Sequence, residues 1–133
     1  MAEFAANCTY LKEANQLNIP NCISLYRAFD GCTSLEKTGI INSKRVKDFS
    51  YMFNGDSELK DVDYIDFSAA ENTYGMFNGC VSLTRVKIIH GSLTTSLSLK
   101  NTKLTIEAVK QLLTDAGNGN GNEINIQNDL IRI

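Results

Sequence analysis

The tetrapeptide Met-Phe-Asn-Gly occurs twice, at Met52–Gly55 and Met76–Gly79, with an offset of 24 residues. The same offset relates an aromatic column, a leucine column and a turn column. Their members are Phe29, Phe53 and Phe77; Leu11, Leu35, Leu59 and Leu83; and Asn7, Gly31, Gly55 and Gly79. One unit of this length cannot bury its own apolar face, whereas stacked units share a continuous core. The sequence therefore predicts a tandem-repeat solenoid, which argues against a conventional enzyme pocket.

The repeat register is expected to run without insertion from about residue 5 to residue 90. A further apolar column holds Leu17, Ile41, Ile65 and Ile89. The position that would continue the aromatic column is Asn101, so the repeat has ended there. The Asn/Gly column predicts a tight turn with a positive φ, which Gly adopts freely and Asn tolerates.

Within each unit, the apolar spacing is Leu-x-x-Φ-x-Φ, where Φ is an apolar residue. The residues that fit are Leu59, Val62 and Tyr64 in one unit and Leu83, Val86 and Ile88 in the next. This spacing predicts a short strand that points alternate residues into the core, with one strand per unit stacked in parallel at about 4.8 Å. The second half of each unit, such as Val46–Phe53, is expected to return over the other side as a turn or a short helix.

Each unit also carries a tract of the form M-F-x-G-C-x-S-L. The copies are Met76–Leu83, Met52–Leu59 with Asp56 in place of Cys, Ala28–Leu35, and a weaker Ala6–Leu11. Over roughly residues 5–104 these units resemble the BspA-type leucine-rich repeats, including the mycoplasma-lipoprotein form. The resemblance implies an α/β, leucine-rich-repeat-like solenoid of about four 24-residue repeats with a parallel strand each. It also implies binding and display on phage virions or on bacterial surfaces, without catalysis.

The 133 residues suit one domain, with the solenoid at 1–104 and a C-terminal strand–helix–strand cap that includes 105–133. Thr105 is a candidate helix N-cap, and Gly117 can end the helix. The residues at helical spacing, predicted to form one apolar stripe, are Ile106, Val109, Leu112 and Leu113. After the loop, Glu123–Ile126 alternates in polarity like a half-buried strand.

The N-terminal end of the predicted solenoid is less well covered. Phe4 and its neighbours are few residues to shield the first unit, so Phe4 marks a candidate docking end for another subunit, domain or assembly. A short cap folded from residues 1–7 is the alternative.

Polar residues on the strands form the candidate interaction surface. Two columns point away from the core; they are Glu13, Lys37, Asp61 and Arg85, and Asn15, Gly39, Asp63 and Lys87. In the first column the charge alternates in sign, so neighbours about 4.8 Å apart could pair along the sheet. The columns are therefore either a self-paired charge ladder or a surface that faces a ligand.

The four cysteines are Cys8, Cys22, Cys32 and Cys80. Cys32 and Cys80 lie two repeats apart, about 10 Å by strand spacing, which is too far for a disulfide. Cys8 and Cys32 lie in adjacent repeats and could pair, but buried thiols that pack as small apolar groups are the favoured interpretation. The chain has no Cys-x-x-Cys motif, and no metal or cofactor is expected.

A catalytic site would have to use His90, the only histidine, which lies where a turn is expected. No nucleophile signature surrounds a Ser or Cys, and the glycine-rich run at 117–121 lacks the Lys-Ser/Thr of a phosphate loop. His90 is therefore interpreted as a solvated turn residue. An enzyme with an atypical site is the least favoured alternative.

The net charge of −2 gives no reason to expect nucleic acid or an anionic membrane as partner. No apolar run is long enough for membrane insertion. The first residues lack the basic and apolar regions of a signal peptide, which favours a particle protein over a secreted one. We therefore expect a non-enzymatic interaction or structural module in a bacteriophage virion or tail, acting in host attachment or assembly. Its partner would be a protein or cell-surface receptor, in a homo-oligomer or larger assembly. The alternative is a fragment of a bacterial BspA-like adhesin at the cell surface.

Overall fold

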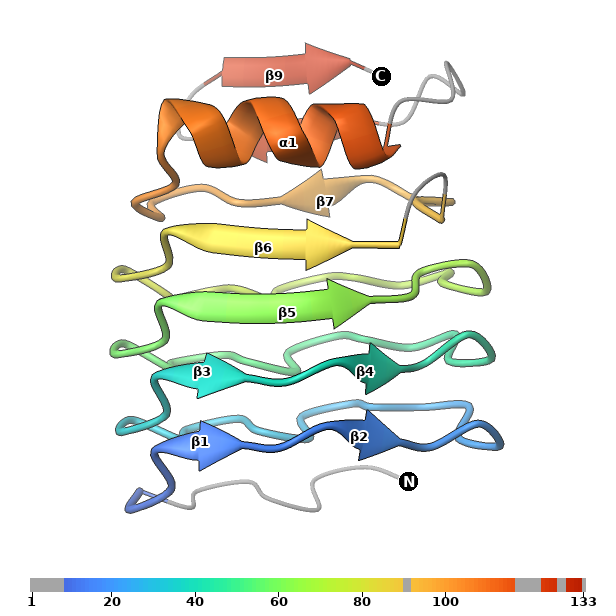
Figure 1. The fold of residues 1–133 in the computed structure, drawn as a ribbon, viewed down its shortest axis with the longest axis vertical. Helices are drawn as coiled ribbons and strands as arrows, with labels where there is room; N and C mark the ends of the chain where they lie inside the picture. Colours follow the sequence, from blue (N-terminus) through green and yellow to red (C-terminus); the bar gives the residue numbers. More distant parts are fainter. Residues whose placement is uncertain (1–8, 90–91, 117–122, 127–128, 133) are drawn as a thin grey trace.

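A computed structural model describes residues 9–89, 92–116, 123–126 and 129–132 of the chain. Within these residues the fold is α/β, with one open parallel sheet, a single C-terminal helix and a second, smaller sheet. The strands of the larger sheet are β1 (Glu13–Ala14), β2 (Leu17–Asn18), β3 (Lys37–Thr38), β4 (Ile41–Asn42), β5 (Asp61–Ile65) and β6 (Arg85–Ile88). In Figure 1 they stack along the long axis of the molecule, and the helix α1 follows β6 in the next layer.

Parallel pairing joins residues that lie 24 positions apart in the sequence. Glu13 of β1 pairs with Lys37 of β3, which pairs with Asp61 of β5. In the same way Leu17 of β2 pairs with Ile41 of β4, and Ile41 with Ile65 of β5. The predicted parallel pairing is thus confirmed, and β5 is long enough to pair with both halves of the previous layer.

The register changes between β5 and β6. Val62 pairs with Val86, but Ile65 pairs with Ile88 and not with Ile89, because β5 takes three residues for a step that β6 takes in two. Ile89 is therefore 40% exposed and Ile88 is buried. The predicted uninterrupted register and the predicted Ile89 column position are wrong at this point.

The same irregularity corrects the predicted direction of Tyr64. Tyr64 was expected to point into the core, but Val62 and Ile65 are the buried residues of β5, and Tyr64 is 38% exposed. Two residues, Asp63 and Tyr64, stand between the buried positions, whereas strict alternation allows only one.

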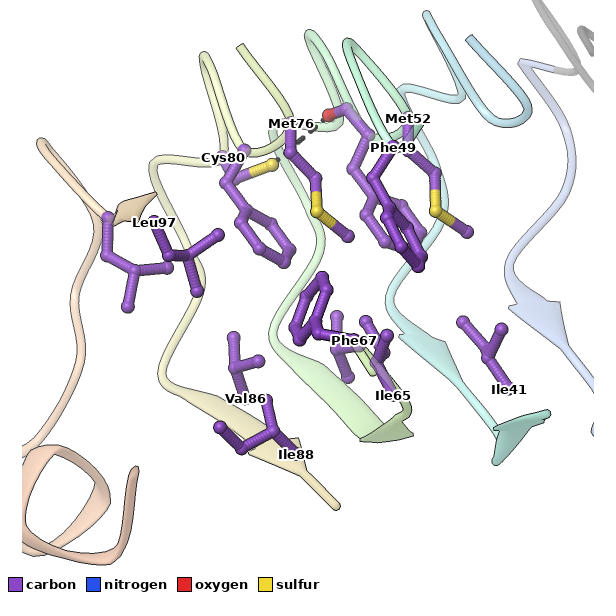
Figure 2. Packing of buried hydrophobic residues seen from close by; sticks show 14 of the residues in the cluster. Ile41, Phe49, Met52, Ile65, Phe67, Met76, Cys80, Val86, Ile88 and Leu97 are labelled. Carbon is purple, nitrogen blue, oxygen red and sulfur yellow. Dashed lines mark hydrogen bonds between the residues drawn. The ribbon is translucent and has the colours of Figure 1, made fainter. Parts of the chain in front are cut away.

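Stacked aromatic rings fill the centre of the core. Phe29, Phe53 and Phe77 are buried, and consecutive ring centroids are 5.6 Å apart with nearly parallel planes. Figure 2 shows Met52, Met76 and Cys80 entering the core from one side and Ile41, Ile65 and Ile88 meeting them from the strands. The 24-residue columns of the sequence are therefore columns of contact in space.

The segments that lead from one layer to the next, residues 19–36, 43–60 and 66–84, are termed the return segments. They consist of turns and isolated bridges, and no helix occurs within them. Their glycines Gly31, Gly55 and Gly79 have φ values of 76°, 79° and 79°, which confirms the predicted turn. Asn7, the first member of that column, lies outside the described residues.

A second line of pairing follows the return segments. Ser24, Asp48 and Asn72 form parallel bridges with one another, and each side-chain oxygen accepts a hydrogen bond from the backbone N–H two residues later. Such local bonds fix the turn, since they satisfy backbone donors that no strand partner reaches.

The C-terminal part contains β7 (Leu97–Ser98), α1 (Ile106–Ala116), β8 (Glu123–Ile126) and β9 (Asp129–Arg132). Strand β8 pairs in parallel with β7 and antiparallel with β9. Thr105 Oγ1 accepts a hydrogen bond from the N–H of Ala108 at 3.1 Å, as predicted for the N-cap. The predicted apolar stripe is wrong in part, because Ile106 is 70% exposed, and the helix buries Ala108, Leu112 and Ala116. Gly117, proposed to end the helix, lies outside the described residues.

A carboxyl group occupies the core where the sequence pattern has cysteine. Cys32 and Cys80 are buried, as predicted, and Asp56 between them is also fully buried, with neither carboxyl oxygen hydrogen bonded. Burial raises the pKa of Asp56 from 3.8 to about 8; the backbone at Cys32 offsets part of this, and the charge of Asp30 adds to it. The carboxyl group is therefore protonated at neutral pH. Cys8, the one proposed disulfide partner of Cys32, lies outside the described residues.

Replacement of Phe53 by Ala is expected to lower the free energy of unfolding by about 3–5 kcal/mol, because it leaves a cavity between two rings. Urea unfolding measures this loss. The matched control is Tyr10→Ala, since Tyr10 is 95% exposed; a change of about 0.5 kcal/mol or less is expected there. Equal effects of the two substitutions would contradict the stacked core.

Asp56 is expected to make stability depend on pH. Its pKa in the folded state, about 8, exceeds the ordinary 3.8, so the folded state binds the extra proton. Its contribution is fully present below pH 4, declines as pH rises towards 8 and levels off above that. The change amounts to a few kcal/mol, at about 1.4 kcal/mol per pKa unit. Urea midpoints at several pH values, with Asp56→Asn as control, measure it; identical pH profiles would exclude a buried carboxyl group.

Candidate interaction surface on the strands

The first predicted polar column lies in one row across β1, β3, β5 and β6. Lys37 Nζ is 3.6 Å from Glu13 Oε1. Arg85 grips Asp61 with two nitrogens: Nε donates to Oδ1 at 3.1 Å, and Nη2 donates to Oδ2. No ion pair joins Lys37 to Asp61 in the described part of the chain, although their backbones are paired. The expected charge ladder is therefore two separate pairs.

The second predicted column contributes one ion pair. Lys87 Nζ is 3.9 Å from Asp63 Oδ1. Asn15 is exposed in the first layer. At Gly39 a Cβ atom would lie 2.8 Å from the backbone nitrogen of Gln16, so two layers approach closely there. Only the part of this column near β6 therefore presents charge.

A third polar row accompanies these two and was missed at the level of sequence. Lys60 Nζ is 3.5 Å from Glu36 Oε1, and Thr84 Oγ1 donates to the backbone oxygen of Lys60 at 2.9 Å. The signal was present, because Lys12, Glu36, Lys60 and Thr84 share the offset of 24. The row precedes the apolar strand pattern and so was not counted with it.

Tyr64 lies among the ion pairs as an exposed aromatic side chain. The ammonium of Lys87 is 5.3 Å from the centroid of its ring, within the range of a cation–π contact. A hollow of about 680 Å³ lies between this ring and the start of α1. Its lining includes Asp61, Tyr64, Arg85 and Lys87 from the strands and Glu107 and Gln111 from the helix. These residues are termed the strand–helix hollow.

The electrostatics of the surface favour recognition over chemistry. Side chains in the Glu13–Lys37 and Asp61–Arg85 pairs are 33–58% exposed, so each pair contributes about 0–1 kcal/mol to stability. The hydrogen bond from Asp61 raises the pKa of Arg85, which therefore stays charged. Rows of this kind orient a partner, while an exposed aromatic residue supplies contact area.

Among the described residues, no cluster of three or more His, Cys, Asp or Glu side chains could hold a metal ion. His90 and the candidate docking residue Phe4 lie outside the described residues. Of the helices described, none has the length and apolar character needed to cross a membrane. Comparison of the chain with protein-family models, curated proteins and solved structures gave no match.

A double-mutant cycle on Asp61 and Arg85, with Asp61→Ala, Arg85→Ala and the double variant, should give a coupling energy of about 0–1 kcal/mol. The coupling should shrink at high salt, since exposed pairs are screened. Glu13 and Lys37, at 3.6 Å, form the comparison pair and should couple no more strongly. A coupling above about 2 kcal/mol that salt leaves unchanged would mean that the Asp61–Arg85 pair is structural.

Proposed function

We propose that this chain is a non-enzymatic interaction module built as a BspA-like leucine-rich repeat solenoid. About four units span residues 1–104, and residues 105–133 complete the C-terminal cap. The support for this architecture is the sequence period together with strand pairs whose partners are 24 residues apart. The stacked rings of the Phe29 column and the left-handed glycines of the Gly31 column have the same period.

The observation that carries the proposed function is the exposure of Tyr64 among paired charges. The bulge in β5 brings this ring to the surface, where Lys87 lies beside it and Asp61 and Arg85 are close by in the same hollow. A protein or cell-surface receptor would bury the ring and use the charged rows for orientation. Glu13, Lys37, Asp63 and Asn15 extend the surface along the strands.

The proposed setting is a bacteriophage virion or tail, where the module would serve host attachment or assembly. The motif resemblance at Met76–Leu83 supports this setting. The same resemblance supports a bacterial surface adhesin as the second candidate. The two candidates share the binding surface and differ in where the chain is found.

Density-gradient fractionation of a culture of the source strain, with detection of the chain by mass spectrometry, tests the setting. We expect the chain to band with phage particles after induction or infection. Recovery in the cell-envelope fraction alone would replace this proposal with the adhesin. Recovery only among free proteins of the cell interior would contradict both candidates.

Replacement of Tyr64 by Ala tests the surface in the same system. We expect about tenfold weaker adsorption of particles to host cells, or incorporation reduced to a similar extent, because the ring provides the central contact. Tyr10→Ala is the matched control, since it removes an equally accessible tyrosine outside the strand–helix hollow. Equal behaviour of the two variants and wild type would exclude this surface.

A further inference from the structure

A second surface, on the return segments, carries three tyrosines in contact. The ring centroids of Tyr26 and Tyr51 are 6.4 Å apart, and those of Tyr51 and Tyr74 are 5.5 Å apart, both with edge-to-face geometry. Beside them is a groove of about 540 Å³, within the range of about 300–1,000 Å³ that small-ligand sites occupy. Its lining includes Tyr51, Tyr74, Asn72, Asn78, Ser98 and Lys100, which are termed the tyrosine groove.

Backbone geometry holds the rings of this groove in place. Arg27, Tyr51 and Gly75, at the 24-residue offset, all have left-handed φ values of 53°, 56° and 63°. A non-glycine residue in this conformation costs roughly 1–2 kcal/mol. At Gly75 a Cβ atom would lie 2.7 Å from Cε1 of Tyr51, so the ring lies directly against the glycine. The guanidinium of Arg27 is 5.3 Å from the Tyr26 ring and 5.5 Å from the Tyr51 ring.

Tyr74 is fixed at its backbone but open at its ring. Its N–H donates to Asn72 Oδ1 at 2.9 Å, and its N-terminal neighbour Thr73 donates from Oγ1 to the backbone oxygen of Ser96 at 2.7 Å. The side chain is nevertheless 71% exposed. An aromatic ring that is held in position and left open to solvent is prepared to stack on a ligand at low entropic cost.

The rim of the groove offers both donors and acceptors. The side-chain nitrogen of Asn72 and the side-chain oxygen of Asn78 have no protein partner among the described residues, since the recorded bonds use the opposite atom of each amide. Ser98 and Lys100 are exposed beside them. Charge is balanced, because the lining contains both Lys100 and Glu71, and Glu71 lies 3.8 Å from Lys47.

We propose that the tyrosine groove binds a short, uncharged oligosaccharide, with one sugar ring stacked on Tyr74. The C–H face of a pyranose suits the electron-rich face of an aromatic ring. Its hydroxyl groups need neighbouring donors and acceptors, which Asn72, Asn78 and Ser98 provide. A polyanion would require a cluster of cations, and a peptide would require apolar side-chain pockets, and the groove lining is dominated by amides and hydroxyls.

The test is binding of the whole chain to a broad glycan array, followed by titration with maltose, cellobiose, lactose and N,N′-diacetylchitobiose. Ring resonances of the tyrosines report contact in the titration. We expect saturable binding, with shifts at Tyr74 and Tyr51, and at least about tenfold weaker binding for Tyr74→Ala, which removes the stacked ring. Tyr74→Phe keeps the ring and should retain most of the affinity. Gly75→Ala should weaken binding, because its Cβ would displace Tyr51.

Two controls make the outcome decisive. Tyr10→Ala removes an exposed tyrosine elsewhere, and Tyr64→Ala alters the strand–helix hollow, so both should bind the glycan like wild type. Circular dichroism checks that Tyr74→Ala is folded, as its exposure predicts. Absence of binding to every glycan, equal binding by Tyr74→Ala, or preference for a polyanion or a peptide would each overturn the proposal. None of these results would alter the case for the strand surface.

Discussion

Backbone hydrogen bonds between segments 23 or 24 residues apart are the interaction on which the rest of the structure depends. On the return side the N–H of Phe29 donates to Met52 at 2.8 Å and the N–H of Phe53 donates to Met76 at 2.9 Å. Parallel pairing of the strands keeps the same spacing on the other side. Because both sides share one period, like side chains stack, and the core becomes a file of rings 5.6 Å apart. A buried backbone group without its partner would cost as much as a lost hydrogen bond, so the register is strongly specified.

This shared period also arranges whatever lies outside the core into rows, but the two sides use the rows differently. On the strands, opposite charges pair within their rows, as Asp61 does with Arg85. On the return segments, Asn54 and Asn78 link their amides at 3.1 Å, and Tyr74 is left open beside them. The strand side therefore suits an oriented protein contact around Tyr64, and the return side suits an uncharged polar ligand.

Much of the core could be predicted from sequence, because repetition makes positions comparable. The Phe29 column, the positive φ of the Gly31 column and the N-cap at Thr105 follow directly from residue type and spacing. Tyr64 could not be placed, because a bulge changes the side of the sheet without changing composition, and Ile88 and Ile89 are equally apolar. The tyrosine groove was missed for another reason. It depends on left-handed backbone at Arg27 and Tyr51, which neither residue type signals.

The most direct test of the 24-residue register is a measurement of scalar couplings across hydrogen bonds by NMR on the isotopically labelled protein. The account predicts a coupling from the nitrogen of Phe53 to the carbonyl carbon of Met76, and another from Tyr51 to Tyr74, since these pairs are hydrogen bonded at 2.9 Å. Couplings from these nitrogens to carbonyls four residues earlier would instead mean helical return segments. That result, or partners at any other offset, would contradict the arrangement on which both proposed surfaces rest.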